Sequence, residues 1–189
     1  MSARLSAKQA AILRTLAAML EHHGAGRITT AALAREMNQS EAALYRHYAS
    51  KAAMFEGLIA MLGELILEDM NHVEATEAQG KARLRKQVHA LLLFVERHPG
   101  AAHVLTGGAL ANESPALQEQ VNVLLQDVEG MLVRSARLRI EQEQLPNDAN
   151  AIAAVLLHYV LGRWLRYAHS GRQAVPTSDL SLHLPMLGL

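Results

Sequence analysis

Three hydroxyl side chains that can each begin a helix follow one another closely: Thr29, Ser40 and Ser50. At the start of a helix such an oxygen accepts a hydrogen bond from a backbone amide of the first turn. The remaining free amides, together with the positive end of the helix dipole, attract anions. Lys51 follows Ser50 directly, where a cation opposes the dipole and costs roughly a few tenths of a kcal/mol. A phosphate at that position would reverse the cost, so the chemistry of this segment is anion binding.

The spacing of these residues predicts two short helices joined by a tight turn. Ile28 and Leu33 stand on either side of the Thr29 cap at the spacing of a hydrophobic staple. The helix that follows ends at Met37, and Asn38 tolerates the left-handed conformation that a turn requires. A packing helix precedes the pair. This arrangement is the plan of a helix-turn-helix DNA-binding motif, which we place at residues 29–48.

The second short helix, residues 41–48, carries most of the polar side chains that could contact DNA. Leu44 is its buried residue, and its alanines are small enough for close approach to the bases. An alternative interpretation is that Arg46 and His47 form a solvated face while Tyr45 and Tyr48 serve packing. Under the DNA-binding interpretation we expect contacts from Arg27, Thr29, Thr30, Gln39, Ser40, Glu41, Ala42, Tyr45, Arg46, His47, Tyr48 and Lys51.

The charge distribution agrees with a nucleic-acid contact at one end of the chain. The formal net charge is zero over 189 residues. Residues 1–51 nevertheless hold seven lysines or arginines against three acids, a local charge of about +4, and the remainder is correspondingly acidic. A basic head on an acidic body is typical of proteins that bind nucleic acid through one region.

Several other classes of protein find no support in the sequence. The chain has no cysteine and so no thiolate metal site or disulfide. The beginning of the chain does not read as a signal peptide, and the most apolar run, 149–161, is too short to span a bilayer. The ten histidines form no recognised metal or catalytic motif, and no nucleotide-binding loop is present. We therefore expect no enzyme, no metal site, no cofactor and a cytoplasmic location.

Hydrophobic periodicity predicts an all-α fold, because no period-two alternation indicates a strand. We expect a helix-turn-helix domain at 1–50 and a helical C-terminal domain for dimerisation and partner binding at 51–189. The expected helices cover 6–22, two short segments after Thr29 and Ser40, 50–71, 82–97, 101–109, 114–142 and 148–169, with a last turn or two in 178–187. Residues 74–80 are expected to be a connector.

The helix predicted at 149–167 is apolar nearly all round, so it must be covered on every side. In a protein of this size a second copy of the chain is the most economical cover. We therefore predict a homodimer with an interface at Leu125, Leu132, Ile152, Val155, Leu156, Tyr159 and Trp164. His158 lies alone in this helix and is expected to be a satisfied core or interface histidine.

The segment from residue 28 to 55 resembles the DNA-binding head of TetR-type regulators. The resemblance rests on Thr29, Thr30, Leu33, Ala34, Ser40, Ala43, Leu44, Tyr45, Tyr48, Ser50, Lys51 and Phe55. It implies a homodimer in which the second short helix of each protomer enters one of two successive major grooves. Thr29, Tyr45, Tyr48 and Lys51 would then lie near phosphates. Gln39 departs from the apolar residue usual at that position.

A more specific resemblance, to the nucleoid occlusion factor subfamily, covers residues 27 to about 135. The run from Arg97-His98-Pro99-Gly100 to Leu105-Thr106-Gly107 carries it, since the wider family shares little sequence there. The resemblance implies association with the nucleoid. It also implies a groove between the 50–71 and 82–97 helices for the C-terminal tail of the division GTPase FtsZ. The matching positions are Met61, Leu65, Ala90, Leu93, Phe94, Arg97 and His98.

Phe94 is off the apolar face expected for its helix, so it could be an exposed hook for an extended peptide; the alternative is that it packs against the 50–71 helix. Two features weaken the functions that the resemblance implies. The N-terminal arm has only Arg4 and Lys8 as cations, which lowers the expected phosphate affinity, and Asp69 places an acid near the groove, where it would repel an acidic tail. Besides a nucleoid occlusion factor, the sequence leaves open a ligand-responsive repressor and a helical interaction module without a DNA role.

Overall fold

The computed structural model describes residues 5–23 and 28–189, and all regular structure in these ranges is helical. The expected all-α class is confirmed. The elements are α1 (Ala7–His23), α2 (Thr30–Glu36), α3 (Glu41–Tyr45), α4 (Lys51–Thr76), α5 (Gly80–Arg97), α6 (Pro99–Leu105), the 3₁₀ turn η1 (Gly108–Leu110), α7 (Pro115–Glu143), α8 (Ala149–His169) and α9 (Leu180–Met186).

Most helix ends agree with the sequence within two residues, and the exceptions are in α3, α4 and α6. α4 continues through Thr76, five residues past its expected end, so the connector shrinks to 77–79. α6 begins at Pro99, because proline fits the first turn of a helix, where its missing N–H is not needed. The expected 101–109 helix stops at Leu105 because Gly107 takes a left-handed conformation with φ of 79°.

The chain divides into two compact units, each built from two stretches of sequence. The first contains residues 1–62 and 98–121, and the second contains residues 63–97 and 122–189. A domain boundary at residue 50 stays a prediction; the first unit includes α6 and the start of α7 as well as the helix-turn-helix.

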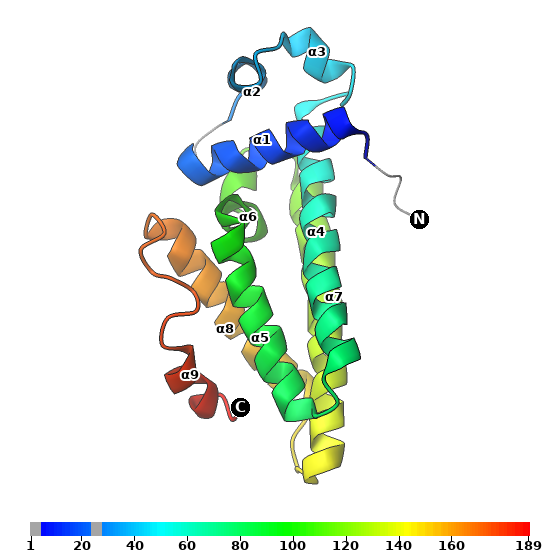
Figure 1. Cartoon of the computed structure of the whole chain (residues 1–189), viewed down its shortest axis with the longest axis vertical. Helices are drawn as coiled ribbons and strands as arrows, with labels where there is room; N and C mark the ends of the chain where they lie inside the picture. The colour runs from blue at the N-terminus through cyan, green and yellow to red at the C-terminus, as the bar shows by residue number, and fades with distance from the viewer. Residues whose placement is uncertain (1–4, 24–27) are drawn as a thin grey trace. The chain divides into compact units, whose positions relative to one another are not determined.

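In the first unit, α1 packs against both α2 and α6 (Figure 1). Ile12, Leu13 and Leu16 of α1 are almost fully buried, as are Leu33 of α2 and Leu44 of α3. Gly100 of α6 approaches the backbone of α1 so closely that a Cβ atom there would overlap the carbonyl oxygen of Ala17. This contact fixes the helix against which the helix-turn-helix packs.

In the second unit, α5 packs against α8 (Figure 1). Trp164 of α8 is fully buried, and its indole N–H donates to the carbonyl oxygen of Leu91 at 2.9 Å. At its first residue, Gly80, α5 lies against the backbone of Arg139 in α7, where a side chain would overlap it. None of the described helices combines the length and apolar character needed to cross a bilayer.

Burial within the protomer corrects the predicted dimer interface. Leu132, Leu156 and Trp164 are each at most 1% exposed, so they belong to the core of the single chain. Tyr159 is half-buried and bonds to His183 of α9. An all-round apolar α8 is covered mainly by its own chain, which the sequence interpretation underestimated.

The exposed face of α8 is narrower than the dimer interface that the sequence predicts on this helix. Val155, His158, Gly162 and Leu165 all lie on it, at spacings of three and four residues. Val155 is 55% exposed and Leu165 41%. His158 is therefore not a core histidine of the protomer.

Candidate nucleic-acid interface and partner groove

The helix-turn-helix forms where its caps predicted. The Thr29 hydroxyl oxygen accepts a hydrogen bond from the amide of Ala32 at 3.1 Å, and that of Ser40 accepts from Ala43 at 3.3 Å. Asn38 adopts the left-handed conformation with φ of 51°. Ile28 and Leu33 are both buried, as the staple requires. The cap and turn predictions are confirmed, although α3 ends at Tyr45 rather than Tyr48.

A chain of hydroxyl contacts holds α3 to α2. The Tyr45 hydroxyl donates to the Thr30 hydroxyl oxygen at 3.3 Å, and the Thr30 hydroxyl donates to the Glu41 carboxylate at 2.6 Å. Thr30 therefore serves to position α3, and the exposed acid of Glu41 is engaged by it. Tyr45 remains 44% exposed, so its ring is available to a ligand.

The other predicted contacts differ in accessibility. Thr29, Ser40, Ala42 and Arg46 are exposed, whereas Gln39 and His47 are half-buried. Arg27 lies outside the described residues, as does Arg4 of the N-terminal arm. The exposed group surrounds the start of α2 and the outward face of α3, where a helix-turn-helix meets DNA.

Tyr48 is a correction. Its side chain is 8% exposed and packs beside Gly57 of α4 and Leu13 of α1. Burial raises the pKa of the Tyr48 phenol, and its hydroxyl is enclosed without a hydrogen-bond partner among the described residues. The predicted phosphate contact through Tyr48 is therefore not available in this conformation.

Lys51 is engaged by a residue that sequence reasoning missed. Its ammonium group forms an ion pair with the Glu113 carboxylate at 2.5 Å and lies 5.6 Å from the centre of the Phe55 ring. Glu113 precedes α7 and lies 62 residues away along the chain. No local pattern marks such a partner, so the sequence alone leaves Lys51 looking unpaired.

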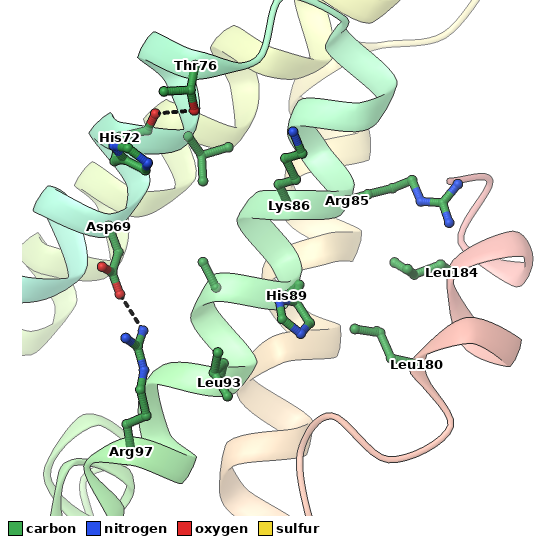
Figure 2. A pocket seen from close by; sticks show the side chains of 12 residues that line it. Asp69, His72, Thr76, Arg85, Lys86, His89, Leu93, Arg97, Leu180 and Leu184 are labelled. Carbon is green, nitrogen blue, oxygen red and sulfur yellow. Dashed lines mark hydrogen bonds and ion pairs between the residues drawn. The ribbon is translucent and has the colours of Figure 1, made fainter.

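The second unit carries a hollow of about 530 Å³ over the outward face of α5, bordered by α4 and α9 (Figure 2). Ala90, Leu93 and Arg97 line it, as the partner-site prediction places them. Leu65 is exposed but does not line it, and Met61 and His98 belong to the first unit. The complete lining comprises Asp69, His72, Val73, Thr76, Arg85, Lys86, His89, Ala90, Leu93, Arg97, Leu180 and Leu184.

Phe94 is buried, which corrects the expectation of an exposed hook. Its side chain is 1% exposed and borders a small void together with Ile66 and Met70 of α4. The alternative interpretation, packing against α4, is the one the structure supports. α5 is buried on more than one face because several helices of the unit enclose it.

Asp69 does not act as an isolated acid at the hollow. Its carboxylate accepts from the Arg97 guanidinium at 2.6 Å across the space between α4 and α5 (Figure 2). Both side chains are partly exposed, so solvent screens the pair and its contribution to stability is small. Its effect is on charge, because each partner neutralises the other at the mouth of the hollow.

The helix-turn-helix head and the all-helical body define a TetR-type DNA-binding regulator. Residues 12–58 match the family model described as "Bacterial regulatory proteins, tetR family", and residues 78–188 match "Tetracyclin repressor-like, C-terminal domain". Among solved structures, the fatty acid degradation regulator FadR from Bacillus halodurans superposes with a TM-score of 0.82 at 13% identity, covering 98% of this chain and 96% of that one. AibR in complex with isovaleryl coenzyme A and operator DNA superposes with a TM-score of 0.77 at 19% identity, covering 95% and 97%. These two likenesses show the fold.

Sequence relatives narrow the assignment to one family. The chain is 41% identical to the nucleoid occlusion factor SlmA of Vibrio cholerae over 93% of its own length and 91% of the relative's. It is also 38% identical to the SlmA of Vibrio atlanticus over 97% and 95%. The chain belongs to the nucleoid occlusion factor family.

Proposed function

We propose that this protein is a nucleoid occlusion factor: a homodimer that binds duplex DNA at chromosomal sites and holds the C-terminal tail of FtsZ, so that the division septum does not assemble over the nucleoid. The observation that carries the proposal is the presence, in one chain of this family, of a well-capped helix-turn-helix and a separate cationic hollow between α4 and α5. The protein would act in the cytoplasm, on the nucleoid, and without catalysis.

The DNA-binding part is supported by the surface around α2 and α3. The hydroxyl of Thr29, the exposed ring of Tyr45 and the Arg46 guanidinium lie in one motif. Such groups contact phosphates and base edges in helix-turn-helix proteins. Lys51 at the start of α4 joins them once it leaves Glu113, because a DNA phosphate competes with that carboxylate for the ammonium group.

Substitutions of Glu113 and of Lys51 are expected to change DNA affinity in opposite directions. Glu113→Gln removes the competing carboxylate, and we expect it to raise DNA affinity several-fold. Lys51→Ala is expected to lower the affinity and to flatten the salt dependence by about one phosphate contact per protomer. Fluorescence anisotropy over a salt series measures both, with a duplex selected from a random pool on the wild-type protein.

The control is the double variant, Lys51→Ala with Glu113→Gln. It is expected to bind like Lys51→Ala alone, because Glu113 acts only through Lys51. If Glu113→Gln alone weakened binding, the pair would serve to position α4, and Lys51 would not be a phosphate contact.

The dimer is supported by the exposed face of α8 around Val155 and Leu165, with Val123 of α7 48% exposed as well. Side chains at alternating spacings of three and four form a continuous stripe on a helix. A partner helix would cover this stripe, and the mid-helix Gly162, around whose Cβ position the chain leaves open space, would allow close approach.

The FtsZ-binding part is supported by the charge and shape of the hollow. A groove between two helices, lined by Leu93 and Ala90 and edged by cations, suits an extended acidic peptide. Arg97 is the cation at one end, and it is paired with Asp69, so a carboxylate of the peptide would compete with Asp69 for it.

The two members of the Asp69–Arg97 pair are expected to have opposite effects on peptide affinity. Arg97→Ala leaves the Asp69 carboxylate uncompensated in the hollow, so we expect binding of an FtsZ tail peptide to weaken roughly tenfold. Asp69→Asn releases Arg97 to the peptide, so binding is expected to tighten. Anisotropy of a fluorescein-labelled peptide measures both affinities. Equal affinities for the wild type and both variants would place the tail elsewhere, and no binding by the wild type would refute the division role.

A further inference from the structure

The hollow extends beyond the space between α4 and α5. It continues across α5 to α9, where Arg85 and His89 of α5 and Leu180 and Leu184 of α9 line it (Figure 2). This side of the hollow is separate from the Asp69–Arg97 side, and none of the partner positions expected from the sequence lies on it. The far side, defined by Arg85, His89, Leu180 and Leu184, is called the α9 side below.

α9 is a fixed wall. The Tyr159 hydroxyl and the Nδ1 atom of His183 share a hydrogen bond of 2.9 Å. The Arg163 guanidinium donates to three backbone carbonyls of the preceding loop, at 2.7 to 3.0 Å. The Glu96 carboxylate accepts from the amide of Thr177 at 2.7 Å. These bonds fix the segment before binding, so a ligand would not have to order it.

The cations that line the hollow differ in whether they already have an ion-pair partner. Arg97 is paired with Asp69, and Lys86 is paired with Glu77 at 2.6 Å. The Lys86 hydrogen bond also holds the pKa of the Glu77 carboxyl below its ordinary value. Arg85 is exposed, and its side chain has no hydrogen bond or ion pair within the described ranges. The cation available to an incoming carboxylate is therefore on the α9 side.

Apolar side chains lie next to this cation. Leu180 and Leu184 face α5 (Figure 2). They are 8% and 6% exposed, so packing holds their side chains in place. A guanidinium beside apolar side chains suits a segment in which an acidic residue adjoins an apolar one. An α-helix is about 10 Å across, so roughly three residues of extended chain lead from the α4 side to the α9 side.

We propose that the peptide bound between α4 and α5 continues across α5 and is held a second time on the α9 side, where Arg85 takes an acidic side chain and Leu180 and Leu184 take an apolar one. This inference rests on the proposed function, since it assumes a peptide on the α4 side. Its occupant is an acidic stretch of the same peptide.

The test combines one charge reversal with two peptides. The probes are a fluorescein-labelled FtsZ C-terminal tail peptide and the same peptide with every aspartate and glutamate replaced by its amide. We expect Arg85→Glu to weaken the acidic peptide about tenfold or more, and to change the amide peptide by less than about twofold. Arg14→Glu, the same reversal at an exposed arginine of α1, controls for net charge and should leave both affinities unchanged.

The outcomes separate the inference from the proposed function. If the wild type binds the acidic peptide and Arg85→Glu binds it equally well, the α9 side is not used and the inference is overturned, while the groove between α4 and α5 stands. If Arg85→Glu and Arg14→Glu weaken binding equally, the effect is one of net charge and the inference is again overturned. If the wild type binds neither peptide, the proposed division role fails as well. Arg85 is exposed, and equal thermal unfolding of wild type and variant confirms that the variant folds.

Discussion

Replacing Gly100 by alanine is expected to lower the free energy of unfolding by about 1–3 kcal/mol, because the added methyl group would overlap the backbone of α1 at Ala17. A backbone carbonyl cannot rotate away as the end of a side chain can, so α1 and α6 must separate. Since α1 supports α2 and α3, DNA binding is expected to weaken with stability. Urea unfolding followed by circular dichroism measures the change.

Gly57→Ala is the matched control in the same unit. A Cβ atom at Gly57 would lie 3.1 Å from a ring carbon of Tyr48, a side chain that can shift slightly. Alanine also favours a helix over glycine by about 1 kcal/mol, which offsets that small shift. The control is expected to unfold near the wild-type urea concentration. Equal unfolding of Gly100→Ala and Gly57→Ala would show that α1 and α6 are not in tight contact.

The second large effect is expected from Val155→Arg on the exposed face of α8. Val155 is 55% exposed in the protomer, so arginine there should leave the single chain folded. In a dimer it would bury a charge on the proposed interface, which is costly without a partner. A dimer holds two half-sites at once, and linked binding of this kind exceeds single-site affinity by about 100- to 10,000-fold. Loss of the dimer is therefore expected to decrease DNA affinity by a factor in that range.

Sedimentation velocity and DNA anisotropy on the same samples measure this effect. Leu182→Arg is the control: Leu182 is 67% exposed on α9, so the variant makes the same kind of change away from the α8 stripe. It is expected to remain dimeric and to bind DNA like the wild type. A dimeric Val155→Arg with unchanged affinity would place the interface on other helices.

The head could be predicted in detail because its signals are local. Thr29, Ser40 and Asn38 each act within three residues of themselves, through a cap bond or a turn conformation. Caps and turns of this kind depend on residue type and spacing, and both are visible in the sequence.

The body was harder because burial there depends on which helices meet. The sequence predicts an interface position for Trp164 and leaves Phe94 open between an exposed hook and a packed side chain; both are enclosed within the second unit. A helix covered on several faces has no clear period, so periodicity cannot identify its free face. The Trp164 hydrogen bond to Leu91 spans 73 residues, and the Lys51–Glu113 pair spans 62. Contacts at such separations leave no local pattern.

The first unit is assembled from two separate stretches, 1–62 and 98–121, and this limits how the DNA-reading part could be transplanted into another protein. A graft of the first sixty residues would carry α1 without α6, and would expose to solvent the backbone of Ala17 that Gly100 contacts. A chimaeric regulator with this specificity would need both stretches, joined by a linker in place of the intervening helix hairpin. Recombination at a single breakpoint would separate the two stretches, so the DNA-binding unit is most easily inherited together with the second unit of the same chain.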